Sequence, residues 1–202
     1  MSEAKRLEPD ADRLAAAQRA LAQATQAAST PPPTAAPAPV PDDEGHARAR
    51  QVVLRQLAVG PRSRRQLADK LRDREFEPAV IDAVLDRMSQ VGLVDDEAYA
   101  ATLVRSKHHG SGLAPRALRH ELRKKGVDPD IAERAVGTVD SDDERARAEQ
   151  LVTERLPRLH GLDREVQTRR LAGLLARKGY PSGLSLSVIR ECLDRAPEHA
   201  RD

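Results

Sequence analysis

Few residues in this chain of 202 amino acids have the type and spacing that catalysis or metal binding requires. Because Cys192 is the only cysteine, neither an internal disulfide nor a thiolate metal cluster is possible, and no histidine lies within one helical turn of it. No Gly-rich phosphate loop and no Gly-x-Ser-x-Gly elbow occur. We therefore expect a protein that is not an enzyme and that uses no metal and no cofactor. The histidines, none of them paired at HExxH or a comparable ligand spacing, are His46, His108, His109, His120, His160 and His199.

Asp95 and Asp96 are the one pair of neighbouring carboxylates that resembles an acid–base site. They stand at the start of a predicted helix over residues 96–107, where negative charge complements the positive end of the helix dipole. A second acidic run, at residues 142–144, precedes another predicted helix in the same way. We interpret both runs as helix starts.

Basic side chains gather in the middle of the sequence, although the chain as a whole has a net charge of only +2. On a helix, Arg116, Arg119 and Arg123 lie within about 60° of one another, opposite Leu118 and Leu122. Such a face is either plainly solvated or the contact surface for an anionic partner, DNA phosphate or an acidic protein surface. The candidate contact residues are Arg105, Lys107, Arg116, Arg119, Arg123, Lys124 and Lys125.

The elements that would position these residues are helices. The chain has one Phe, two Tyr and no Trp, so its core must consist mainly of Leu, Val, Ile and Ala. From residue 46 the apolar residues recur at helical spacing, and no segment alternates as a strand would. No run of 18 apolar residues and no apolar N-terminal signal region are present, so we expect a cytoplasmic protein without a membrane span.

A threefold internal repeat organises the helical part. The segments that begin at Leu67, Leu118 and Leu171 align, with steps of 51 and 53 residues. Another helical stretch precedes each segment, so each repeat comprises three helices in about fifty residues. The alignment places Phe76, Val127 and Tyr180 in one apolar position, which indicates core residues rather than base-stacking platforms. Tyr99 is expected to pack as well.

The predicted fold is all-α, with three tandem helix-turn-helix-like repeats that form an elongated curved solenoid. Residues 28–41 contain six of the 14 prolines, and residues 1–45 have a net charge of −3, so we expect a disordered N-terminal tail and linker there. Ser63 with Gln66, and Ser141 with Glu144, have the capping-box spacing of helix starts. The expected boundaries are 1–45 for the tail, 46–94, 95–140 and 141–195 for the repeats, and 196–202 for a C-terminal tail.

A helix-turn-helix transcriptional regulator is the alternative interpretation of repeat 1. Its recognition helix would be residues 78–90, which expose Asp82 and Asp86, and the counterpart in repeat 2 exposes Asp130 and Glu133. Phosphates would repel these carboxylates, and a wing hairpin is absent from the pattern. Sequence-specific DNA reading is therefore disfavoured.

The chain strongly resembles the RecX family, bacterial regulators of the RecA recombinase, over residues 47 to about 194. The most specific part is the run GLVDDEAYAATLVRSKHHG from Gly92, followed by LRHELRKKGVD from Leu118. One departure is Glu75, which stands where the other repeats have Gly126 and Gly179, so the turn of repeat 1 is expected to differ.

The resemblance implies a non-enzymatic regulator that binds RecA, or RecA filaments on single-stranded DNA, and inhibits ATP hydrolysis, strand exchange and coprotease activity. It thereby implies a role in DNA repair, homologous recombination and the SOS response. Weak non-specific DNA binding remains open, and no membrane and no small-molecule substrate are expected. End capping, groove binding and filament destabilisation all stay open, as do the oligomeric state and the role of residues 1–45.

Overall fold

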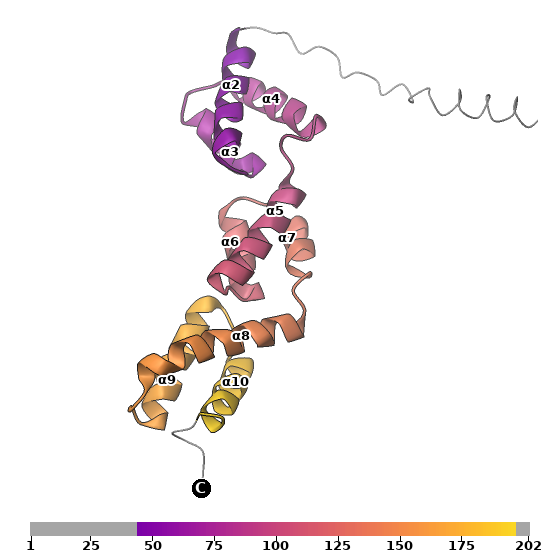
Figure 1. Cartoon of the computed structure of the whole chain (residues 1–202). Helices are drawn as coiled ribbons and strands as arrows, with labels where there is room; N and C mark the ends of the chain where they lie inside the picture. The colour runs from indigo at the N-terminus through magenta and orange to yellow at the C-terminus, as the bar shows by residue number, and fades with distance from the viewer. Residues whose placement is uncertain (1–43, 197–202) are drawn as a thin grey trace, which may run out of the picture. The chain divides into compact units, whose positions relative to one another are not determined.

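A computed structural model describes residues 44–196, and within this range helices joined by short turns and loops make up the chain, without a strand (Figure 1). Repeat 1 comprises α2 (Glu44–Val59), α3 (Arg64–Arg72) and α4 (Pro78–Gln90). Repeat 2 comprises α5 (Asp96–Arg105), the π-helix η1 (Ser106–Gly110), α6 (Pro115–Lys124) and α7 (Pro129–Val136). Repeat 3 comprises α8 (Ser141–Arg155), the 3₁₀-helix η2 (Leu156–Leu159), α9 (Arg164–Lys178) and α10 (Ser182–Asp194).

The three-helix repeats predicted from the sequence are thus confirmed. The helix α2 begins at Glu44, two residues before the expected start of repeat 1, and the rest of the predicted N-terminal tail lies outside the described residues. None of the described helices is long and apolar enough to cross a bilayer.

Short polar side chains start several helices as the sequence predicts. Ser63 accepts a hydrogen bond from the backbone N–H of Gln66, whose side chain accepts one from Ser63 in return. Asp95 accepts from the backbone N–H groups of Glu97 and Ala98, which confirms the interpretation of that acidic run as a helix start. The capping box predicted at Ser141 is wrong, because Asp140 already satisfies the first N–H groups of α8.

Each repeat has its own hydrophobic core. The middle helices α3, α6 and α9 each bury two leucines on one face, and the aligned first helices each bury an Ala and a Val four residues apart. Because the buried side chains are small and aliphatic, three helices can pack closely without aromatic residues. The leucines are Leu67 and Leu71, Leu118 and Leu122, and Leu171 and Leu175.

The aligned residues after the middle helices belong to these cores, as predicted. Val127 and Tyr180 are buried, and Phe76 is half-buried against the core of repeat 1. Tyr99 packs against the core of repeat 2.

The turn after each middle helix has the same left-handed backbone. Gly126 has a φ of 73° and Gly179 a φ of 91°, and Glu75 adopts a φ of 61° at the aligned position. The expectation of a different turn in repeat 1 is therefore wrong. Three-helix packing requires this conformation whatever residue supplies it, and only glycine adopts it without a steric cost.

Consecutive repeats meet at these turns. A Cβ atom at Gly126 would lie 2.5 Å from Cβ of Arg65, and one at Gly179 would lie 2.8 Å from both Cβ and the backbone nitrogen of Ala117. Arg65 and Ala117 belong to the first turns of α3 and α6. The start of one middle helix thus rests on the turn that ends the next, and glycine permits that distance.

One hydrogen bond recurs at both contacts. Ser63 Oγ donates to the Lys125 carbonyl at 2.5 Å, and the aligned Ala114 donates its backbone N–H to the Lys178 carbonyl at 2.9 Å. Each carbonyl precedes the left-handed glycine, where a helix leaves its last C=O groups without an internal partner. The preceding repeat therefore supplies the missing donor.

Replacement of Glu75 by Gly should stabilise repeat 1 by about 1 kcal/mol, because it removes the cost of a left-handed non-glycine residue. Urea denaturation followed by circular dichroism measures the change. Glu75→Ala is the matched control, since it removes the same charge and keeps the Cβ atom. Equal stabilities of the two variants would contradict the assignment of strain to this backbone.

Replacement of Gly179 by Ala should destabilise the protein by about 2 kcal/mol or more, because the new Cβ meets backbone atoms of Ala117 at an unfavourable φ. Gly183→Ala is the control, since it lies in α10 with no atom near the new methyl group, and it should stabilise by up to about 1 kcal/mol. Thermal unfolding of both variants tests the pair. A tolerated Gly179→Ala would argue against the close contact.

Candidate functional site

The predicted contact residues lie on the end of α5, on η1 and along α6. Arg116, Arg123 and Lys124 are exposed on α6, while Leu118 and Leu122 on its opposite face are fully buried. Arg105 and Lys107 are also exposed, at the α5–η1 boundary. These five cations have no carboxylate within ion-pair distance among the described residues, so they present positive charge to solvent.

Arg119 differs from the rest of the predicted set. Its Nε donates to both carboxylate oxygens of Glu133 on α7, at 2.8 and 2.9 Å, and the side chain is half-buried. A guanidinium held in this geometry is oriented toward α7, so it is less available to a partner. Lys125 is half-buried as well, since its carbonyl forms the contact with Ser63.

The basic stretch continues through a π-helix. Residues 106–110 (SKHHG) widen the end of α5, and His108 alone among them is buried. His108 Nδ1 lies 2.9 Å from the Leu113 carbonyl, and its ring meets the ring of His109 edge to face at a centroid distance of 5.2 Å. The inward turn of His108 leaves Lys107 and His109 exposed.

Repeat 3 fixes the backbone of this stretch. Lys178 Nζ donates to the Ser111 carbonyl at 2.6 Å, and the Tyr180 hydroxyl donates to the Gly112 carbonyl at 3.3 Å. Arg147 Nε donates to the His108 carbonyl at 3.3 Å. The segment between α5 and α6 is therefore held by three side chains of the following repeat.

Glu144, in the first turn of α8, interacts electrostatically with this basic region. Burial raises the pKa of its carboxyl, while the charges of His108 and Arg119 lower it. A carboxylate at the start of α8 thus partly balances the cationic segment beside it.

The exposed acids of the third helices are confirmed, and two of them form intramolecular ion pairs. Asp86 on α4 forms an ion pair with Arg64 on α3 at 2.7 Å, and Glu133 on α7 pairs with Arg119 on α6. Both pairs link the second and third helices of one repeat. These carboxylates lie on the helices that would read DNA bases, where hydrogen-bond donors to base edges would be expected. Their presence weighs against major-groove recognition.

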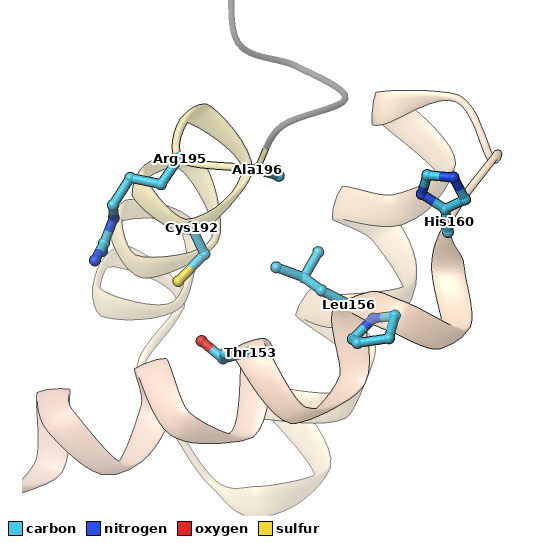
Figure 2. Close-up of a pocket in the computed structure, with 7 residues that line it drawn as sticks. Thr153, Leu156, His160, Cys192, Arg195 and Ala196 are labelled. Atoms are coloured by element: carbon cyan, nitrogen blue, oxygen red, sulfur yellow. The ribbon is translucent and has the colours of Figure 1, made fainter.

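A pocket of about 470 Å³ lies in repeat 3 between α8, η2 and α10 (Figure 2). Cys192 and Thr153 approach it from two helices, and Leu156 lies between Cys192 and His160, which stands at the far side (Figure 2). Burial raises the pKa of the Cys192 thiol, which keeps it protonated and unreactive near neutral pH. The lining is mainly apolar, and Cys192 and His160 lie on opposite sides of the pocket (Figure 2).

Sequence reasoning missed a second basic cluster, formed by Arg48, Arg55 and Arg74 of repeat 1. The repeat alignment contained a signal, because Arg74 aligns with Lys125 and Lys178. The convergence of Arg74 with α2 depends on the fold of the turn and was not visible in the spacing.

Two of the three repeats match known three-helix domains separately. Residues 49–88 match the first three-helix domain of RecX, and residues 95–136 match the second. Regulatory protein RecX of Streptomyces lividans is 48% identical over 151 residues, which cover 75% of this chain and 80% of the relative. The chain belongs to the RecX family.

Further relatives extend the RecX match. Regulatory protein RecX of Thermobifida fusca is 48% identical over 163 residues, 81% of this chain and 86% of the relative. That of Mycolicibacterium smegmatis is 41% identical over 184 residues, 86% of this chain and 98% of the relative. The crystal structure of RecX from Lactobacillus salivarius has the same fold, with a TM-score of 0.67 and 22% identity over 73% of this chain and 96% of that one.

Tyr180 makes the stability of this RecX-family fold sensitive to alkaline pH. Burial raises the pKa of Tyr180 to about 12, so the folded state retains a proton that the unfolded state loses near pH 10. Stability should therefore fall as the pH rises from about 10 to about 12. Tyr180→Phe should be about 1 kcal/mol less stable at neutral pH, since it loses the hydrogen bond to Gly112, and should show a weaker alkaline decline. Urea denaturation across this pH range measures both effects, and equal alkaline slopes would contradict the role of Tyr180.

Proposed function

We propose that this protein is a non-enzymatic cytoplasmic regulator that binds RecA, or RecA filaments on single-stranded DNA, and inhibits ATP hydrolysis, strand exchange and coprotease activity. Through this inhibition it would act in DNA repair, homologous recombination and the SOS response. Membership of the RecX family is the observation that carries the proposal.

The proposed contact surface is the basic face of repeat 2. The exposed members, Arg105, Lys107, Arg116, Arg123 and Lys124, would contact the filament directly, while Arg119 and Lys125 would support the face from its edge. A partner that carries phosphate or carboxylate groups fits this unpaired positive charge. Three tandem repeats also allow simultaneous contact with successive filament subunits, which raises avidity without a deep pocket.

A transcriptional regulator with helix-turn-helix repeats is the competing function. Asp86 and Glu133 argue against it, because these acidic side chains lie on the two candidate recognition helices and would be repelled by DNA phosphates. The proposal for RecA is therefore the stronger one.

The direct test is the single-stranded-DNA-dependent ATP hydrolysis of RecA at increasing concentrations of this protein. We expect inhibition well below one molecule per RecA, since a blocked filament end or a destabilised interior affects many subunits. No inhibition, even at excess and low salt, would contradict the proposed function.

A charge-reversal variant tests the surface. Lys107→Glu with Arg116→Glu and Arg123→Glu should weaken inhibition by about tenfold or more, since it reverses three exposed charges and spares the Arg119–Glu133 pair. The matched control reverses three exposed arginines of repeat 3 and should retain inhibition within about threefold. Circular dichroism checks that both variants are folded, and equal inhibition by both would contradict this surface. The control residues are Arg155, Arg158 and Arg190.

A further inference from the structure

A pocket of about 420 Å³ in repeat 1 has a cationic rim and an apolar floor. Its rim consists of Arg48, Gln51 and Arg55 from α2 and of Arg74 from the turn after α3. Val52 and Phe76 form its floor, and no carboxylate is part of its lining.

The arginines of this pocket lack the ion pairs that neutralise the neighbouring cations. On α3 and its end, Arg65 and Arg72 both pair with Asp69, and Lys70 pairs with Asp73. No carboxylate lies within ion-pair distance of Arg48, Arg55 or Arg74 among the described residues. Their positive charge is therefore concentrated on one concave surface and available to an external anion.

The position of the pocket in the repeat explains why it is open. In repeats 2 and 3, the preceding repeat donates a hydrogen bond to the carbonyl of Lys125 or Lys178, the residues that align with Arg74. Repeat 1 has no preceding repeat among the described residues, so this contact is not made at Arg74.

Glu75 also keeps another helix from covering the turn in the same way. The contacts at Gly126 and Gly179 require the space that a Cβ atom would fill, and Glu75 has such an atom. The first repeat thus keeps a strained residue at the position where the others have glycine, and no described helix covers its exposed arginines.

We propose that this pocket binds the phosphodiester backbone of single-stranded nucleic acid. Arg48 and Arg55 are seven residues apart on α2, which separates them by about 10.5 Å along the helix axis. Guanidinium groups at that separation, with a third from another element, fit a chain that carries charge at every unit better than one isolated anion. Gln51 can bond a base edge, and the half-buried ring of Phe76 offers an apolar contact for a base.

This inference goes beyond the proposed function, because the pocket binds the strand itself and requires no RecA. An acidic peptide is the rival ligand, since carboxylates also fit guanidinium groups. Fluorescence anisotropy of a labelled oligothymidine with the full chain alone tests the two, so the result is independent of RecA inhibition.

The test variant is Arg55→Glu with Arg74→Glu, two exposed residues whose replacement leaves the core intact. We expect it to weaken oligothymidine binding by about tenfold or more, and to lower the slope of log affinity against log salt by about 1.4, as two lost phosphate contacts predict. The matched control, Arg155→Glu with Arg158→Glu, makes the same change of net charge in repeat 3 and should keep the slope.

Two results would overturn the proposal. One is equal affinity and equal salt slope for the test and control variants, with circular dichroism showing that both are folded. The other is displacement of the oligothymidine by a polyglutamate peptide of equal charge at equal concentration, in the wild-type protein but not in the test variant, which would assign the pocket to an acidic peptide.

Discussion

Contacts between consecutive middle helices join the described repeats to one another. At each contact the start of a middle helix donates a hydrogen bond to the last turn of the following one, and a left-handed glycine allows the backbones to approach. A three-helix unit of about fifty residues buries little apolar surface by itself. Stability therefore depends on these contacts as well as on the three small cores.

The second contact also shapes the candidate interface. Lys178 and Tyr180 flank Gly179, and both donate hydrogen bonds to the segment that carries the π-helix. The same turn that joins repeats 2 and 3 thus holds Lys107 and His109 in their exposed positions. A change at this contact would disturb the stability of the protein and its basic surface together.

Ion pairs decide which of the many charges are available to a partner. The chain has 34 basic and 32 acidic side chains, so most cations could find a carboxylate. Ion pairs between the second and third helices of a repeat neutralise the charges of Arg64 and Arg119. Exposed cations without a carboxylate partner among the described residues include those on the face of repeat 2, those around the pocket of repeat 1 and several of repeat 3, such as Arg155 and Arg190. The two proposals for binding rest on the first two groups, because several such cations share one helix face in repeat 2 and one pocket in repeat 1.

The sequence by itself determined the helices, their order and the residues of their cores, because helical periodicity, caps and the 51- and 53-residue steps are local or repetitive signals. It also indicated the basic face of α6, since spacing along one helix fixes which side chains share a side. Only the tertiary structure showed that Glu75 has the left-handed backbone of the aligned glycines and that Arg119 is hydrogen-bonded to Glu133. It also showed that Arg74 lines the same pocket as Arg48 and Arg55 of α2. Each of these features depends on how separate segments pack together. Contacts between residues that are distant in sequence produce no periodic pattern from which they could be predicted.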